Sequence, residues 1–235
     1  MKIDFVSDVS CPWCAIGLNA LEQALERVGP EISATLHFQP FELNPQMPGE
    51  GQDVVEHLSQ KYGIDAAQVA ANAEAIRQRG AGVGFSFGQG MRRRVYNTFD
   101  AHRLLHWAGL VDGDKQRALK HALFKAYFTD GLNPGDHAVL VQAAVASGLD
   151  ADEARAVLES NDFHDAVREA QQFFHQQGIS SVPAVIINDR HLISGGQPVE
   201  LFERALRHLA AEGQGDGQQD GQQEGQQEGR AGAAT

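Results

Sequence analysis

The chain has 235 residues, 42% of them hydrophobic, and its 19 Lys and Arg against 31 Asp and Glu give a formal net charge of −12. This length is sufficient for a substantial apolar core. The acidic excess argues against nucleic-acid backbones and a polybasic membrane anchor, and no apolar run reaches the about 18 residues of a membrane span. Neither nucleic acid nor a membrane is therefore an expected partner.

The N-terminus leads directly into a predicted strand. Met1 and Lys2 are followed by alternating residues, whereas a secretory signal would begin with a basic segment and a longer apolar stretch. The chain has only two cysteines, Cys11 and Cys14, and a bond between them would close a loop too short to add much stability. We therefore expect a cytoplasmic protein in which the pair is kept reduced and serves chemistry.

The secondary-structure elements follow from hydrophobic periodicity and turn residues. A strand over 3–9 precedes a helix over 12–28, for which Pro12 suits the first turn, and a second strand over 33–41. Helical periodicity then dominates 53–177, apart from a glycine-rich loop over 80–90. The last predicted elements are a hairpin, with strands at 184–187 and 191–193, and a helix that begins near Val199.

The first and last parts of this order resemble the two halves of a thioredoxin fold. We therefore predict an α/β protein with a thioredoxin-like fold, formed by residues 1–43 and 180–212, and a large all-helical insertion over 44–179. Residues 213–235 repeat Gly, Gln and acidic residues and contain no apolar side chain larger than Ala or Thr. Such a composition predicts a disordered tail, because it cannot bury enough surface to offset its ordering entropy.

The motif Cys11-Pro12-Trp13-Cys14 lies between the first predicted strand and the first predicted helix. The N–H groups and partial positive charge of a helix N-terminus stabilise a thiolate and lower its pKa below the free value of about 8.5. We therefore expect Cys11 to be the exposed, attacking sulfur. Cys14, one helical turn later, is expected to face inward and to resolve the mixed disulfide.

Two structural alternatives stay open for this pair, a zinc site and an inert buried pair. A zinc site needs two further ligands, and the nearest candidates are His102 and His106, four residues apart on a predicted helix. Histidines at that spacing are expected more often on a helix flank, so no metal site is predicted.

A second element, Ser181-Val182-Pro183, precedes the third predicted strand, where sheet geometry alone tolerates a proline. With the cysteine motif and the order of elements, it makes the chain resemble the DsbA-type branch of the thioredoxin superfamily. Within that branch the chain is similar to the FrnE-like group, which is related to 2-hydroxychromene-2-carboxylate isomerases and kappa-class glutathione transferases. Residues 4–8, 41–45, 97–104 and 195–198 also carry the resemblance.

The resemblance implies a thiol–disulfide oxidoreductase or isomerase that acts on disulfides and thiols of proteins or small molecules. It also implies a cis Val182–Pro183 bond packed against the cysteines, so we expect Pro12, Trp13, Val182 and Pro183 to contact substrate. No bound cofactor is expected, and glutathione is the candidate co-substrate. The alternative function is a glutathione-dependent isomerase or transferase, although those relatives have Ser where Cys11 stands. A third hypothesis is a non-enzymatic metal-binding module.

Further residues near these motifs have two interpretations each. Arg92-Arg93-Arg94 is typical of a solvated surface and less often of an anion site for glutathione carboxylates. Asp8 has a position typical of a turn or capping residue; the alternative interpretation is that it accepts the proton of Cys14. Trp13 presents an apolar face to a peptide or glutathione, or it packs on the insertion. Because no His separates the cysteines, we predict a redox potential between the about −270 mV of thioredoxin and the about −120 mV of DsbA.

Overall fold

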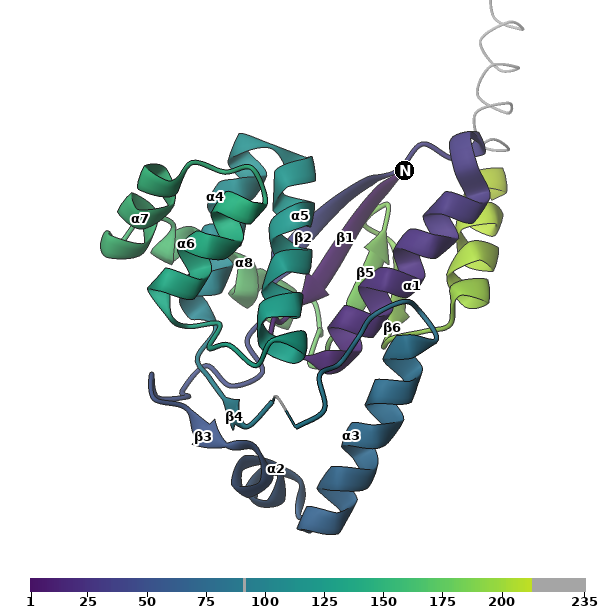
Figure 1. Ribbon diagram of the computed structural model, residues 1–235. Coiled ribbons are helices and arrows are strands. Elements are labelled where there is room, and N and C mark those ends of the chain that lie inside the picture. Colours follow the sequence, from purple (N-terminus) through teal and green to yellow (C-terminus); the bar gives the residue numbers. More distant parts are fainter. Residues whose placement is uncertain (91, 213–235) are drawn as a thin grey trace, which may run out of the picture.

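The structure is a computed structural model that describes residues 1–90 and 92–212. Its centre is a four-stranded sheet in the order β2-β1-β5-β6 (Figure 1). Strand β1 (Lys2–Ser7) pairs in parallel with β2 (Thr35–Pro40) and antiparallel with β5 (Ala184–Ile187), which pairs antiparallel with β6 (His191–Ser194). This arrangement confirms the predicted α/β, thioredoxin-like fold class.

Helix α1 (Pro12–Val28) has the predicted bounds and connects β1 to β2 through a short 3₁₀ turn (Gly29–Glu31). Strand β1 ends earlier than the predicted strand because the chain turns at Asp8, whose carbonyl accepts a hydrogen bond from the Cys11 N–H at 3.1 Å. Pro12 stands in the first turn of α1, where a missing N–H leaves no bond unmade. The cysteine motif is therefore held at the junction of a buried strand and a helix.

Helix α1 lies beside the C-terminal helix, which the structure describes over 199–212 (Figure 1). The two helices cover one face of the sheet and share an apolar cluster with β1. Members with no exposed surface include Ile3, Phe5, Leu18, Leu21, Phe202 and Leu206. This cluster ties the start of the chain to its last described helix.

The insertion between β2 and β5 is mostly helical. In Figure 1 its helices α4 to α8 lie beside the sheet, and α2 and α3 extend below it. The elements are α2 (Val54–Tyr62), α3 (Ala66–Ala81), α4 (Phe99–Val111), α5 (Gly113–Phe124), a π-helical turn (Lys125–Thr129), α6 (His137–Ala146), α7 (Ala151–Glu159) and α8 (His164–Gln176).

Aspartates begin many of these helices. The side chains of Asp53, Asp65, Asp112, Asp136 and Asp150 each accept backbone N–H bonds at the N-terminus of α2, α3, α5, α6 and α7, respectively. Such caps satisfy donors that have no partner within the helix and typically stabilise it by about 1 kcal/mol each. Part of the acidic excess of the chain therefore has a local structural role.

The insertion is not all-helical, which corrects the sequence-based expectation. Strands β3 (Gln52–Asp53) and β4 (Arg94–Val95) form a two-stranded antiparallel sheet. Two residues are too few to produce the alternation by which a strand is recognised in a sequence. The glycine-rich loop also begins slightly later than predicted, because α3 continues to Ala81.

Buried apolar side chains of the insertion belong to three clusters. One lies among α4 to α7 and includes Leu104, Leu119 and Leu140. Phe124 and Phe128, also from the insertion, instead join the cluster of α1. The domain boundaries at 43/44 and 179/180 stay a prediction, and the tail prediction for 213–235 lies outside the described residues. No described helix has both the length and the apolar character needed to cross a bilayer.

Candidate active site around the cysteine pair

The two cysteines lie at the start of α1. Cys11 is the N-cap residue of the helix, and its carbonyl accepts a hydrogen bond from the Cys14 N–H at 3.1 Å. Both are free thiols. The structure thus confirms the predicted placement of the motif between strand and helix, and the first turn brings the two residues together.

Cys11 is buried, so the expectation of an exposed sulfur is wrong. Its exposed fraction is 3%, against 0% for Cys14. The segment before β5 covers it, and the Cys11 thiol donates to the Val182 carbonyl over a sulfur–oxygen distance of 3.6 Å. Between the cysteines, Trp13 is 42% exposed and forms the accessible surface of the motif. Sequence periodicity could not reveal this cover, because Val182 is far away along the chain.

The two thiols differ in acidity. A hydrogen bond with the Cys14 thiol lowers the pKa of Cys11; burial opposes this effect, and the backbone N–H groups of Cys14 and Trp13 add to it. Burial is the main cause that raises the pKa of Cys14 well above its ordinary value, and the neighbouring Cys11 raises it further. Cys11 is therefore the sulfur that ionises first, in the order that the motif predicts.

The Val182–Pro183 peptide bond is cis, which confirms the prediction. The Pro183 ring lies against α1 at Gly17, where an added Cβ would stand 3.1 Å from the proline Cγ. The Pro183 carbonyl accepts a hydrogen bond from Gly195 N–H at 2.8 Å. The Val182 carbonyl oxygen contacts the Cys11 sulfur, so residues 182 and 183 both lie at the site.

Trp13 and Pro12 face different surroundings. The Trp13 backbone and indole lie at Gly196, where an added Cβ would stand 2.9 Å from the Trp13 carbonyl oxygen. Pro12 instead lines a cavity of about 370 Å³ between α2, α3, residues 87–90 and Arg92. Its apolar walls include Leu58, Val69, Ile76, Phe87 and Phe128. The motif thus has an exposed aromatic side chain on one flank and an apolar cavity on the other.

Arg92 borders the same cavity and is half-buried, which corrects the solvated-surface interpretation for this residue. Its Nε donates to the Tyr127 hydroxyl at 3.0 Å, and its Nη2 donates to the Ser10 carbonyl at 3.4 Å. The guanidinium lies 5.7 Å from the ring centres of both Tyr127 and Phe128. Arg94 donates to backbone carbonyls at 50 and 51, whereas Arg93 is exposed.

Asp8 lies behind the motif and is 1% exposed. Its carboxylate accepts from Ser10 N–H at 3.1 Å, from the Ser10 hydroxyl at 2.9 Å and from Leu43 N–H at 2.8 Å. Burial acts to raise its pKa, but His102 and these donors outweigh burial and lower the pKa to about 2. Asp8 therefore stays ionised and has the turn-stabilising role that its position predicts.

His102 is 2% exposed, so it does not lie on a helix flank as expected. Its Nε2 is 3.5 Å from the Asp8 carboxylate, while His106 stacks on Phe163 at 5.3 Å between ring centres. The two histidines thus have different neighbours. Within residues 1–90 and 92–212, no group of three or more His, Cys, Asp and Glu side chains is placed to hold a metal ion.

Sequence reasoning missed Lys120, which is 1% exposed on α5. Burial lowers its pKa to about 8, while the charges of Cys14, Asp8 and Cys11 act in the opposite direction. A lysine on a helix is ordinarily a surface residue. The one available signal was its place in the apolar stripe that contains Leu119, Leu123 and Phe124.

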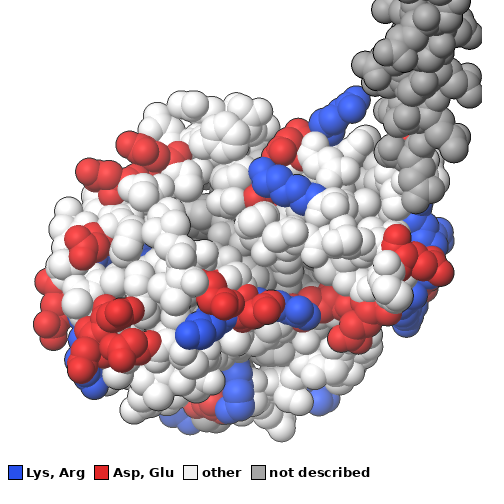
Figure 2. Space-filling model, turned by 90° about the horizontal axis from the view of Figure 1, so that it is seen from above, with Lys and Arg blue, Asp and Glu red and all other residues white. Residues whose placement is uncertain are grey.

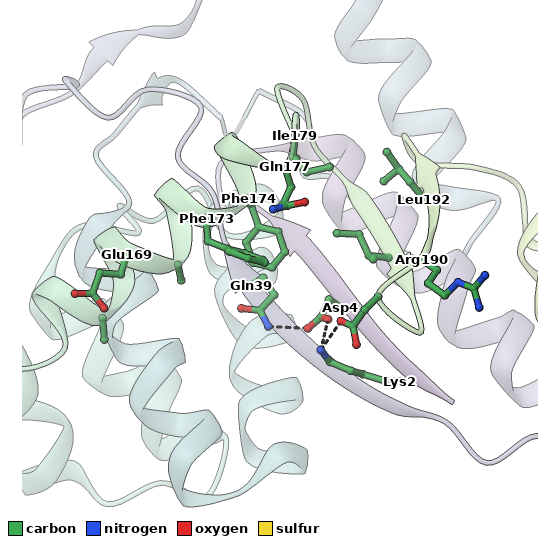
Figure 3. Close-up of a pocket in the computed structure, with 14 residues that line it drawn as sticks. Lys2, Asp4, Gln39, Glu169, Phe173, Phe174, Gln177, Ile179, Arg190 and Leu192 are labelled. Atoms are coloured by element: carbon green, nitrogen blue, oxygen red, sulfur yellow. Dashed lines mark hydrogen bonds and ion pairs between the residues drawn. The ribbon is translucent and has the colours of Figure 1, made fainter.

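A larger cavity, of about 620 Å³, lies elsewhere (Figure 3). Lys2 and Asp4 at the start of β1 line it, whereas the cysteines follow the end of that strand. Figure 3 shows Lys2, Asp4 and Gln39 grouped at one side, where Gln39 Nε2 donates to Asp4 at 2.7 Å. Because side chains alternate along a strand, Asp4 and Phe5 point to opposite faces, and this cavity lies across the sheet from α1.

Comparisons with known proteins agree with this geometry. The family model described as a DSBA-like thioredoxin domain matches residues 2–207. The crystal structure of a probable DsbA oxidoreductase, SCO1869 from Streptomyces coelicolor, is 33% identical, with a TM-score of 0.82 and coverage of 88% of this chain and 89% of that one.

Two further proteins match a similar share of the chain. The uncharacterised protein YwbO of Bacillus subtilis is 28% identical over 207 residues, which are 88% of this chain and 96% of YwbO. The cytosolic disulfide reductase DsbM of Pseudomonas aeruginosa, solved with GSH, shares the fold at 16% identity and a TM-score of 0.62, over 89% of this chain and 98% of DsbM. On the family match and the likeness to SCO1869, the chain belongs to the DSBA-like thioredoxin domain family.

Proposed function

We propose that this protein is a thiol–disulfide oxidoreductase in which Cys11 attacks and Cys14 resolves. The observation that carries the proposal is the unequal acidity of two adjacent free thiols at a helix N-terminus, with the pKa of Cys11 lowered and that of Cys14 raised. Only the thiolate is nucleophilic, so the first attack falls to Cys11.

The exchange proceeds in two displacement steps. The Cys11 thiolate attacks one sulfur of a substrate disulfide, a new S–S bond forms, and the second substrate sulfur leaves as a thiolate with the electron pair of the broken bond. Cys14, after losing its proton, attacks the Cys11 sulfur, and the first substrate sulfur leaves in the same way. The substrate gains two electrons, and the protein becomes the Cys11–Cys14 disulfide; the reverse sequence oxidises a dithiol.

Pro12, Trp13, Val182 and Pro183 form the substrate surface in this proposal. Trp13 presents its exposed indole, and Pro12 opens onto the apolar cavity of about 370 Å³. In the reduced protein the Cys11 thiol donates a hydrogen bond to the Val182 carbonyl oxygen. Ionisation of Cys11 or formation of a disulfide removes this donor, and the oxygen can then accept a hydrogen bond from a substrate N–H. These features fit an apolar polypeptide segment next to a disulfide, as well as a small disulfide.

Electron flow toward the substrate is the direction we propose, in a cytoplasmic setting with glutathione as the co-substrate that restores the dithiol. Stabilisation of the Cys11 thiolate at the helix start makes the pair more oxidising, and the lack of a histidine within the motif limits that effect, so the pair keeps the capacity to donate electrons. On the face shown in Figure 2, basic and acidic side chains are interspersed, which is in keeping with partners that need no polyanion site. No bound cofactor or metal is part of the proposal.

The test uses serine replacements of each cysteine. Cys14→Ser should accumulate a mixed disulfide at Cys11 with a peptide disulfide, detected by mass spectrometry, whereas Cys11→Ser should lose disulfide exchange. Wild-type protein should form the internal disulfide with loss of two thiols. Equal alkylation rates of the two thiols in the reduced protein would overturn the roles assigned to them. Turnover in Cys11→Ser would overturn the proposed reaction and favour a glutathione-dependent isomerase.

A further inference from the structure

Three consecutive arginines, Arg92, Arg93 and Arg94, lead from the glycine-rich loop into β4. In Figure 1 the segment that carries them runs below the start of α1. Within residues 1–90 and 92–212, their side-chain hydrogen bonds all go to backbone carbonyls and one tyrosine hydroxyl, so no carboxylate there neutralises them. Their charge extends to α2, where Lys61 and Arg92 add to burial in lowering the pKa of His57. Positive charge without a partner, in a chain of net charge −12, attracts anions.

A space of about 270 Å³ opens beside this segment, and its lining consists of Arg93, Arg94, Tyr96, Tyr127 and Gly131. No acidic side chain is among these five residues. Asp53 stands opposite Arg94 in the sheet of β3 and β4, but its carboxylate accepts from the first N–H groups of α2. The space therefore has cationic and phenolic walls.

The Arg94 guanidinium is fixed in this wall. Its Nε donates to the Glu50 carbonyl at 2.9 Å, and its Nη2 donates to the Gly51 carbonyl at 2.8 Å. Its Nη1 forms no hydrogen bond in the part of the chain that the structure describes. Arg93 is exposed and forms one long bond, from Nε to the Gly90 carbonyl at 3.4 Å. The two guanidinium groups thus keep N–H donors for an oxyanion, whose geometry the planar fork of arginine matches.

Arg92 connects this space to the cysteine pair. Its Nε donates at 3.0 Å to the hydroxyl of Tyr127, which lines the space. Its Nη2 donates at 3.4 Å to the carbonyl of Ser10, the residue before Cys11. The guanidinium and its two hydrogen bonds together span less than about 10 Å. A small molecule whose disulfide lies at Cys11 can therefore extend one end toward the space.

We propose that Arg93 and Arg94 bind a carboxylate of the disulfide substrate, an inference that rests on the proposed function. The substrate class is then a small or peptidic disulfide that carries a carboxylate a few bonds from the sulfur attacked by Cys11. Arg94 Nη1 and the Arg93 guanidinium are the donors. A free oxyanion such as inorganic phosphate has the same chemistry, so it should compete with such a substrate for the space.

Two substrates of one shape test the site. 4,4′-Dithiodibutyrate has a carboxylate at each end, and its diamide is the neutral counterpart. Rapid quench with alkylation of the remaining thiols measures how fast each disulfide oxidises the reduced protein. Arg93→Gln should slow the reaction of the dicarboxylate by about 10-fold, as expected for a lost charge-assisted hydrogen bond, and leave that of the diamide within about twofold.

The matched control is Arg190→Gln, which removes the same charge from an exposed residue in the turn between β5 and β6, at the opposite end of β1 from the cysteines. It should alter neither rate by more than about twofold. Arg93→Lys keeps the charge but lacks the fork, so it should lose about threefold with the dicarboxylate only. If Arg93→Gln slows both substrates equally, or slows neither, the proposal is wrong.

Inorganic phosphate distinguishes a free oxyanion from a substrate carboxylate. At constant ionic strength, phosphate should slow the reaction of wild-type protein with the dicarboxylate and have no effect on the reaction with the diamide. Arg93→Gln should abolish this inhibition. Equal inhibition of both reactions would mean that phosphate acts away from the space, and it would contradict the proposal.

Binding to the Cys11→Ser protein separates this inference from the proposed function. NMR titration of its arginine side chains with dithiodibutyrate should produce shifts that disappear when Arg93→Gln is added. If these shifts are observed but wild-type protein exchanges neither disulfide, the proposed function fails and the oxyanion site stands. If wild-type protein exchanges both disulfides and the titration produces no shifts, the oxyanion site alone is wrong.

Discussion

The two ends of β1 each place a lysine near an aspartate, with opposite results. At the start of the strand, Lys2 Nζ lies 3.0 Å from Asp4 and 2.6 Å from Asp189, and its side chain is 47% exposed. The hydrogen bond to Asp189 is the main cause that raises the pKa of Lys2. Beyond the end of the strand, the charge of Asp8 acts to raise the pKa of Lys120, but burial outweighs it and lowers the pKa of Lys120 to about 8.

The difference shows that access to water, rather than the pairing of residue types, decides what a charge does. The ammonium of Lys2 stays hydrated, so its pairs contribute little and simply favour the charged form. The ammonium of Lys120 loses its hydration, and the attraction of nearby anions only partly compensates for that loss. The two lysines should therefore affect stability differently, and four measurements test or refine this comparison.

The largest effect is expected from Asp8→Ala. The change leaves Leu43 N–H and Ser10 N–H without their buried acceptor and removes the partner of His102. We expect the free energy of unfolding to fall by about 3–5 kcal/mol. Urea denaturation at pH 7 measures it, and a loss below about 1 kcal/mol would mean that water satisfies these donors.

Lys120→Met should stabilise the protein at pH 7. The unfolded lysine binds a proton more tightly than the buried one, so wild-type stability should rise with pH between about 8 and 10.5. The variant lacks this dependence and should exceed wild type by about 3 kcal/mol at pH 7, with the difference vanishing near pH 10.5. Parallel pH series of both proteins provide the measurement; a constant difference would contradict a buried, neutralisable lysine.

The acid side of the stability profile reports on Asp8. Its pKa is about 2 in the folded protein against an ordinary value of 3.8, so its contribution is complete above about pH 4 and is lost as pH falls toward 2. The expected loss is about 2 kcal/mol. Asp8→Asn should flatten that part of the profile, and an unchanged slope in this variant would assign acid sensitivity to other carboxyl groups.

The smallest effect is expected from Asp189→Asn at the opposite end of the strand. Its carboxylate is 66% exposed, and its lysine partner is exposed as well. The free energy of unfolding should change by less than about 0.5 kcal/mol, and the change should disappear in high salt. A larger effect would mean that the two ends of β1 are less different than their exposure indicates.

Local sequence signals predicted the elements that depend on neighbouring residues. Helix α1 has its predicted bounds because Pro12 suits its first turn and Gly29-Pro30 ends its apolar stripe. The resemblance to the family led to the cis Val182–Pro183 bond, which the sequence pattern alone left open. Strands β3 and β4 were missed, since each has only two residues and is stabilised by pairing with a distant segment.

The sequence by itself determined the junction that holds Cys11 and Cys14, because this follows from periodicity and from the start of one helix, and the order of its elements carried the resemblance that led to the fold class. Tertiary structure alone decided how deeply the site is buried. Val182 covers the Cys11 sulfur, and Arg92, His102 and Lys120 turn inward because distant segments fold over them. Hydration of a charged group depends on such long-range packing, and the apolar stripe around Lys120 was the one local signal that this lysine is buried.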